Sequence, residues 1–280
     1  MYSPIYFFDA AGSRKIERMD VFIVGCGYTG SRVAQRFLAR GAKVSVTTRN
    51  PDKLSLPGAE ILKYEAGDER PLPVPRAALV LHSLPSVAGE DPTPALLRAL
   101  GEAPARMVYF STTGVYGAAK QVDENTPVQA RGVREAARLQ AESAVRAGNW
   151  SSIVLRPAAI YGPGRGAHEA MRRGEFYLVG EGSNFVSRIH VDDLAAHAEA
   201  ALLSDVEGAW PVADEEPCTS RQMAEFCSQL LGVPMPPSVP YDQAHHTRQA
   251  DRRVDGSAIR QRLGLTLRYP SYRLGIPASV

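Results

Sequence analysis

The sequence has few cysteines, no block of like charges and no long apolar run. Its 280 residues include three cysteines and carry a formal net charge of +2. Cys26, Cys218 and Cys227 follow no metal-ligand spacing, and their odd number argues against a disulfide framework. The small charge gives no electrostatic reason to expect nucleic acid or an acidic membrane surface as a partner. We therefore expect a globular protein in the reducing cytoplasm, with neither nucleic acid nor a membrane as its partner.

The first 18 residues contain no convincing targeting or membrane segment. Their apolar run has no basic residue before it and is far too short to span a bilayer. Met19 stands immediately before the first predicted strand. We therefore expect residues 1–18 to be a flexible extension, or to result from a start codon assigned upstream of Met19.

A glycine pattern, Gly25-x-Gly27-x-x-Gly30, joins a predicted strand at 21–24 to a predicted helix ending at Arg40. In such a strand-turn-helix the first glycine allows the tight turn, the second lets a pyrophosphate approach, and the third lets helix and strand pack closely. The phosphates would face free amides at the helix start. The pattern predicts a dinucleotide site that also includes Tyr28 and Thr29.

The residue after the second predicted strand, 43–48, bears on the choice of cofactor. NAD sites usually carry an acidic residue here, whereas an arginine accommodates the 2′-phosphate of NADP. Arg49 therefore favours NADP, with NAD as the alternative and a solvated arginine as the structural interpretation. Asp68 follows the third strand and could reach the adenine, but a simple turn at Gly67-Asp68 explains it equally well.

The remaining strands predict the fold. Further strands at 60–64, 77–81, 106–110 and 152–155 alternate with helices at 93–101 and 131–147. This rhythm predicts an α/β doubly wound parallel sheet, the Rossmann fold. We expect a dinucleotide-binding domain at 19–163, to which 188–213 returns, and a smaller discontinuous substrate cap from 164–187 and 214–280.

Two further predicted strands end in polar residues at the sheet edge where such folds bind ligands. His82 and Ser83 follow one of them, and Ser111 follows the other. His82 could touch the ribose or diphosphate, or it could be a structural histidine with satisfied hydrogen bonds. We include all three among the candidate cofactor residues.

Four blocks in this order resemble the extended short-chain dehydrogenase/reductases, the superfamily of NAD-dependent epimerases and dehydratases. They are the glycine loop 25–30, Ser111–Gly117, Leu155–Gly164 and Arg188–Asp193. The glycine spacing resembles the atypical branch of that superfamily. The resemblance implies an NAD(P)-dependent enzyme, with Thr112 as the hydroxyl that binds a substrate oxygen. It also suggests a homodimer through helix 131–147.

The resemblance fails where these enzymes carry their Tyr-x-x-x-Lys dyad. With the helix aligned on Leu139 and Glu142, the dyad positions hold Arg134 and Arg138, which cannot take and return a proton. The two arginines could jointly bind a substrate carboxylate or phosphate. Alternatively, Glu135 and Glu142 pair with them on a solvated face.

Tyr116 and Lys120 form a literal Tyr-x-x-x-Lys sequence outside that helix. The spacing works only where both residues share a helical face, and here Gly117 and the turn-like 123–127 follow. We interpret the match as accidental, although Tyr116 could still line the substrate pocket. Thr112, together with its neighbours, could instead only satisfy backbone groups at the strand end.

Two functions follow from these features. The first is an NADP-preferring oxidoreductase or epimerase-like enzyme for a small carbonyl, alcohol or nucleotide-sugar substrate. The second, motivated by the missing dyad, is a catalytically silent protein that senses NADP(H).

Overall fold

A seven-stranded parallel sheet forms the centre of the computed structural model, which describes residues 7–8, 14–15, 19–86, 90–245 and 248–280. The strand order is β14-β9-β7-β6-β3-β4-β5, and every neighbouring pair is parallel. The chain turns outward in both directions from β3, so the switch point lies between β3 and β6. Ligands bind at such a point in open α/β sheets. The predicted fold class is confirmed.

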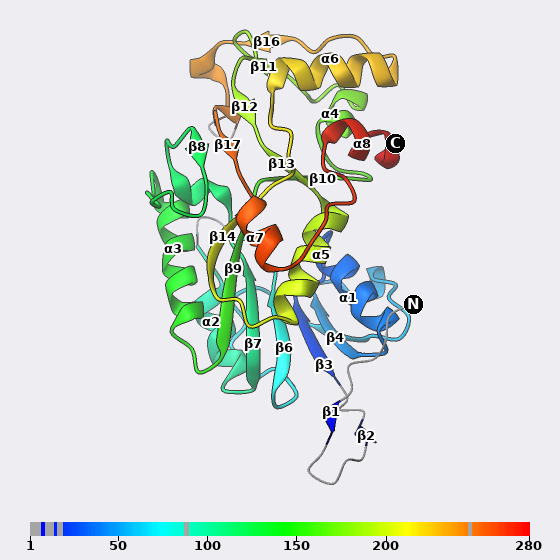
Figure 1. The fold of residues 1–280 in the computed structure, drawn as a ribbon, viewed down its shortest axis with the longest axis vertical. Helices are drawn as coiled ribbons and strands as arrows, with labels where there is room; N and C mark the ends of the chain where they lie inside the picture. Colours follow the sequence, from blue (N-terminus) through cyan, green and yellow to red (C-terminus); the bar gives the residue numbers. More distant parts are fainter. Residues whose placement is uncertain (1–6, 9–13, 16–18, 87–89, 246–247) are drawn as a thin grey trace.

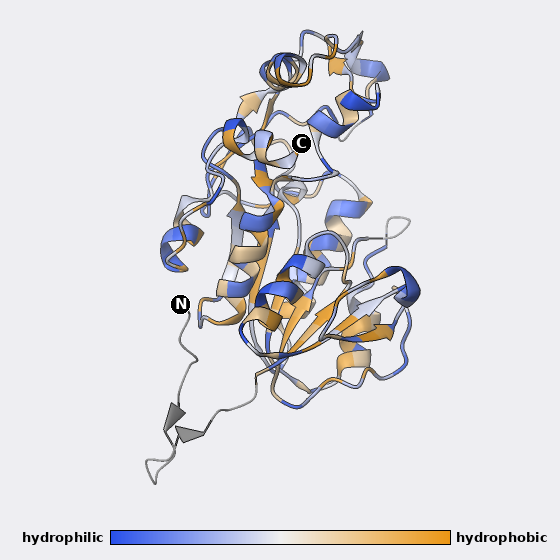
Figure 2. Ribbon diagram, turned by 90° about the vertical axis from the view of Figure 1, so that its right-hand side faces the viewer, coloured by the Kyte–Doolittle hydropathy of each residue, from blue (hydrophilic) through white to orange (hydrophobic). Residues whose placement is uncertain are grey.

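The sheet has seven strands, and all but β14 begin and end close to predicted limits. They are β3 (Asp20–Val24), β4 (Lys43–Thr48), β5 (Glu60–Lys63), β6 (Ala78–His82), β7 (Pro104–Phe110), β9 (Ser151–Pro157) and β14 (Gly208–Val212). Apolar residues fill most of these strands because both faces of the sheet are covered. Figure 2 shows this as apolar colouring in the central strands.

Helices cover both faces of the sheet (Figure 1). One face packs against α1 (Gly30–Ala39), α5 (Val191–Leu202) and α7 (Ser257–Arg262), and the other against α2 (Thr93–Leu100) and α3 (Val133–Arg146). The predicted helices 93–101 and 131–147 are confirmed with slightly shorter ends.

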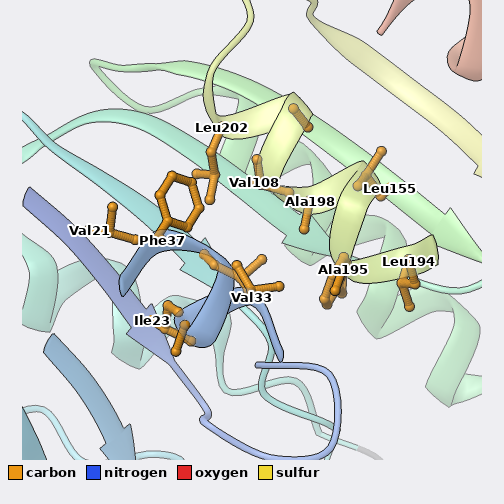
Figure 3. Close-up of a cluster of buried hydrophobic side chains, with 14 of the residues drawn as sticks. Val21, Ile23, Val33, Phe37, Val108, Leu155, Leu194, Ala195, Ala198 and Leu202 are labelled. Atoms are coloured by element: carbon orange, nitrogen blue, oxygen red, sulfur yellow. The ribbon is translucent and has the colours of Figure 1, made fainter. Parts of the chain in front are cut away.

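The packing of α1 against α5 follows from residue size and spacing. Val33 and Phe37 of α1 are fully buried among Ala198 and Leu202 of α5 and the strands below, as Figure 3 shows. Small alanines let the two helices approach closely. Outside this core, Glu199 of α5 accepts hydrogen bonds from Arg36 and Arg40, each at 2.5 Å.

A second group of elements lies above the carboxyl ends of the strands (Figure 1). Their strands are β8 (Gln121–Val122), β10 (Ala159–Tyr161), β11 (Leu178–Val179), β12 (Phe185–Val186), β13 (Arg188–His190), β15 (Cys218–Thr219), β16 (Ser238–Val239) and β17 (Arg253–Val254). Their helices are α4 (Ala167–Arg172), α6 (Ser220–Leu231) and α8 (Tyr272–Gly275). Single 3₁₀ turns are η1 (Pro51–Lys53), η2 (Thr113–Tyr116), η3 (Tyr241–Gln243) and η5 (Pro277–Ser279).

One of these strands corrects the sequence interpretation. The predicted strand 152–155 extends to Pro157 in β9, and a further strand, β10, follows it within the segment 156–164, for which no strand was predicted. β10 pairs with β13 in parallel. Three residues are too few to show a strand periodicity, so the pairing partner, 29 residues along the chain, decides the structure.

Most of the predicted extension 1–18 lies outside the described residues. The described part forms β1 (Phe7–Phe8), which pairs antiparallel with β2 (Arg14–Lys15). All three cysteines are free and buried. No helix in the described ranges has both the length and the apolar character that a bilayer crossing requires.

Candidate functional site

Each glycine of the loop between β3 and α1 has a distinct geometric role. Gly25 has a φ of 89°, which a residue with a side chain rarely adopts. A Cβ on Gly30 would lie 2.8 Å from the carbonyl oxygen of Gly25, so only glycine lets the helix pack this close. A Cβ on Gly27 would meet nothing within 4 Å, so this residue borders open space. The three roles are those that the dinucleotide pattern requires.

The loop is held so that its amides face outward. The amide of Gly25 donates to Thr47 Oγ1 at 3.0 Å, and the amide of Cys26 donates to the Thr47 carbonyl at 2.7 Å. Within the described ranges, the amides of Tyr28, Thr29 and Gly30 donate to no protein acceptor. Free amides at the start of a helix attract phosphate groups. The loop thus fits a dinucleotide diphosphate.

Tyr28 joins the glycine loop to the segment after β10. Its hydroxyl donates to the carbonyl of Pro163 at 3.0 Å. The guanidinium carbons of Arg32 and Arg165 lie 4.4 Å and 5.4 Å from its ring centroid. Arg32 also donates to the Tyr28 carbonyl at 2.7 Å and pairs with Asp192 at 2.9 Å. The sequence interpretation did not anticipate these arginine contacts.

Arg49 and Asp68 differ in their hydrogen-bond and ion-pair partners within the protein. Arg49 lies exposed at the end of β4, and no hydrogen bond or ion pair holds it among the described residues. Asp68 accepts from the amide of Arg70 at 3.0 Å and pairs with its guanidinium at 2.5 Å. These hydrogen bonds lower the pKa of Asp68. The turn interpretation of Asp68 matches this geometry.

His82 is fully buried and both ring nitrogens have partners. The amide of Leu84 donates to Nδ1 at 3.3 Å, so Nε2 carries the proton and donates to Thr93 Oγ1 at 2.7 Å. Burial lowers the pKa of His82 to about 3. The ring is therefore neutral and structural in this conformation. Ser83 is half-buried beside it, and its amide donates to the Val24 carbonyl at 2.9 Å.

The chain of hydrogen bonds from His82 continues to the helix position where lysine was expected. Thr93 Oγ1 donates to Asp91 Oδ1 at 2.5 Å. Asp91 Oδ2 then accepts from Tyr109 at 3.1 Å and pairs with Arg138 at 3.1 Å. Arg138 also donates to the Tyr109 hydroxyl at 2.5 Å. Burial raises the pKa of Tyr109, so this network holds Arg138 without supplying an acid for neutral pH.

Arg134 and Arg138 differ in their exposure to solvent. Arg134 is exposed near the start of α3, whereas the side chain of Arg138 is 8% exposed. The alternative in which Glu142 pairs with these arginines on a solvated face is wrong. Glu142 is buried and pairs with Arg156 at 2.6 Å. That alternative considered only partners on the same helix. The partner of Glu142 is Arg156 on β9, and the partner of Arg138 is Asp91 on the loop before α2.

Ser111 and Tyr116 form hydrogen bonds with the buried Glu142–Arg156 ion pair. Ser111 donates to Glu142 at 2.5 Å, and Arg156 donates to the Tyr116 hydroxyl at 3.1 Å. Burial raises the pKa of Tyr116. This network fastens the end of β7 to α3 and β9.

Thr112 is half-buried beside this network and caps η2. Its Oγ1 accepts from the amide of Gly114 at 3.0 Å. A hydroxyl group has one proton to donate as well, so capping leaves Thr112 able to donate to a substrate oxygen.

Lys120 does not share a helical face with Tyr116. η2 ends at Tyr116, and Gly117 has a φ of 60°. The Lys120 side chain is 72% exposed and pairs with Asp251 at 3.2 Å. This geometry agrees with the interpretation of the Tyr-x-x-x-Lys sequence as accidental.

Comparisons with known proteins find one matching family model and several similar proteins. Residues 93–211 match the family model described as NAD dependent epimerase/dehydratase family. A 3-diazoavenalumate denitrifying reductase from Streptomyces sp is 31% identical over 169 residues, which are 55% of each protein. The chain thus spans about half the length of this curated relative.

Two solved structures extend the similarity over the whole fold. A conserved protein of unknown function from Silicibacter pomeroyi is 33% identical, with a TM-score of 0.78 over 93% of this chain and 97% of that chain. MoeE5 in complex with UDP-glucose and NAD is 22% identical, with a TM-score of 0.74 over 93% of this chain and 97% of that chain. The second likeness concerns the fold alone.

Proposed function

Because the chain belongs to the NAD-dependent epimerase/dehydratase family, we propose that it is an NADP-preferring oxidoreductase acting on a small substrate. The geometry of Gly25, Gly27 and Gly30 carries this proposal. Open space over Gly27 and free amides at the start of α1 fit a dinucleotide diphosphate.

Arg49 supports the preference for NADP. It stands where a 2′-phosphate is read in such folds, and none of the described residues neutralises it. When bound, the cofactor supplies or accepts a hydride. Thr112 would orient the substrate through its free hydroxyl proton.

The residues around α3 limit how a proton reaches the substrate. Tyr109 and Tyr116 are buried and bonded to arginines, and both pKa values are raised. Arg138 stays charged at any working pH. We therefore propose that water, rather than Tyr109, Tyr116 or a side chain of α3, supplies or takes the proton.

Small carbonyl compounds, alcohols and nucleotide sugars are the substrates we propose. The names of the relatives add UDP-glucose and 3-diazoavenalumate to this set. The second name describes a denitrifying reductase that acts on a diazo compound. Where a diazonium group loses N₂ on reduction, the step needs a hydride and no proton, since the hydride takes the place of N₂ on the carbon. Such an acceptor would suit a site without a helix-borne acid.

A turnover screen tests the proposal. Each substrate class is mixed with NADPH or NADP⁺, and absorbance of the reduced cofactor is followed for wild type and Thr112→Ala. We expect turnover with at least one class, and a loss of at least tenfold in Thr112→Ala, since one hydrogen bond to the reacting oxygen is removed. Cofactor binding without any absorbance change across the screen would contradict it.

The closed network around Arg138 favours a second candidate, a protein that senses NADP(H) without turnover. In this network the side chains of Asp91, Tyr109 and Arg138 bond to one another, so none of them is free to transfer a proton to a substrate. This candidate predicts different affinities for NADPH and NADP⁺ and no catalysis. Equal affinities would remove its rationale.

A further inference from the structure

The turn after β10 fixes the position of Arg165. Gly162 and Arg165 exchange backbone hydrogen bonds, from the Gly162 amide at 2.9 Å and from the Arg165 amide at 3.0 Å. Between them lie Pro163 and Gly164, and Gly164 has a φ of 74°. Proline followed by a glycine of positive φ is typical of a tight turn. The backbone that carries Arg165 is therefore held in place.

This turn is docked onto the glycine loop. The Tyr28 hydroxyl donates to the Pro163 carbonyl at 3.0 Å, and a Cβ on Gly162 would lie 2.7 Å from that hydroxyl. The Arg165 guanidinium carbon lies 5.4 Å from the centroid of the Tyr28 ring. Arg165 therefore lies next to a loop that begins 140 residues earlier in the sequence.

Arg165 differs from its basic neighbours in having no acidic partner among the described residues. Arg32 pairs with Asp192 at 2.9 Å. Arg172 pairs with Glu169 at 3.3 Å, and Arg173 pairs with Glu175 at 2.9 Å. The Arg165 side chain is exposed and forms no such ion pair in the described ranges. An uncompensated guanidinium matches phosphate oxygens in both charge and donor geometry.

We propose that Arg165 binds the diphosphate of the dinucleotide together with the free amides of the glycine loop. This assignment rests on the proposed cofactor site. It divides recognition between two arginines, since Arg49 would read the 2′-phosphate and Arg165 a group common to NAD and NADP. It also makes the turn after β10 part of the cofactor site.

Equilibrium titration of NADP⁺ and NAD⁺ separates these roles. We expect Arg165→Ala to weaken both cofactors by about ten- to a hundredfold, the loss for a charge-assisted hydrogen bond, and to leave their affinity ratio unchanged. Arg165→Lys should recover part of the loss. Arg173→Ala, which removes a nearby paired arginine, is the matched control and should bind as wild type does. Adenosine 2′-monophosphate lacks the diphosphate, so its binding should respond to Arg49→Ala and not to Arg165→Ala.

Several outcomes would overturn the assignment. Wild-type affinity of Arg165→Ala for both cofactors would show that Arg165 does not bind them. A loss confined to NADP⁺ and adenosine 2′-monophosphate would show that Arg165 reads the 2′-phosphate instead. Wild-type protein that bound neither dinucleotide would contradict the proposed function and this assignment together, whereas the other two outcomes would leave the proposed function intact.

Discussion

Arg138 of α3 forms a buried ion pair with Asp91, with 3.1 Å between Nη1 and Oδ2. This is the helix position at which the resemblance implies a catalytic lysine. The pair also includes the Tyr109 hydroxyl, so the arginine is held by two partners inside the protein. This position therefore carries a cation, as a lysine would, but the Arg138 guanidinium is buried inside the protein.

Loss of this pair should destabilise the protein. Arg138→Ala would leave Asp91 buried without its counter-charge, which costs about 3–5 kcal/mol in comparable sites. Arg134→Ala is the matched control, because Arg134 is exposed one turn away and should change stability by at most ~0.5 kcal/mol. Urea denaturation measures both free energies of unfolding. Similar, small effects would show that the buried pair is not structural.

Two glycines of the loop should respond in opposite ways. Gly30→Ala forces a Cβ against the Gly25 carbonyl and should cost about 1–3 kcal/mol of stability. Gly27→Ala meets no protein atom within 4 Å, so it should fold normally and lose dinucleotide affinity. Thermal unfolding and cofactor titration of both variants test this. A Gly27→Ala variant that binds cofactor normally would mean that the diphosphate does not approach there.

Tyr116 and Lys120 should behave as independent residues. Lys120→Ala removes an exposed ion pair and should leave any turnover nearly intact, with a stability change within ~1 kcal/mol. Tyr116→Phe removes a buried hydrogen bond to Arg156 and should cost about 1 kcal/mol. Steady-state kinetics and urea denaturation report the two effects. Abolished turnover in both variants would instead identify them as a catalytic dyad.

Acid should destabilise the fold partly through His82. Its pKa falls from 6.5 to about 3 on folding because of burial, so the unfolded chain binds more protons between these values. Stability from this group is present above pH 6.5 and is lost as the pH falls toward 3, at up to about 1.4 kcal/mol per pH unit. Unfolding free energies of wild type and His82→Asn at pH 7 and pH 5 measure it. Equal pH slopes would show that His82 is not the source.

The sequence predicted the sheet well because its strands carry their own signal. Both ends of β4 were predicted correctly, because β-branched residues between Gly41 and Arg49 favour an extended strand. The glycine loop was also predicted from local sequence, because the backbone conformation or close packing at each position depends on the glycine itself. These features depend on residues within a few positions of one another.

The partners of the site residues could not be predicted because they are distant in sequence. Asp91 lies on a loop without periodicity, 47 residues before Arg138. Arg165 reaches Tyr28 only through the pairing of β10 with β13. Sequence spacing indicates neighbours on one element, whereas these contacts depend on how several elements pack. The domain limits and the homodimer through 131–147 remain predictions.

Calorimetric titration of NADP⁺ and NAD⁺ into wild type and Arg49→Ala shows whether the protein binds a dinucleotide and whether Arg49 sets the preference for NADP⁺. We expect wild type to bind both dinucleotides and to prefer NADP⁺. Arg49→Ala should weaken NADP⁺ by roughly ten- to a hundredfold, because a charge-assisted hydrogen bond is worth ~1.5–3 kcal/mol, and should change NAD⁺ little. Equal losses for the two cofactors would show that Arg49 does not read the 2′-phosphate. Failure of wild type to bind either cofactor would contradict the account as a whole.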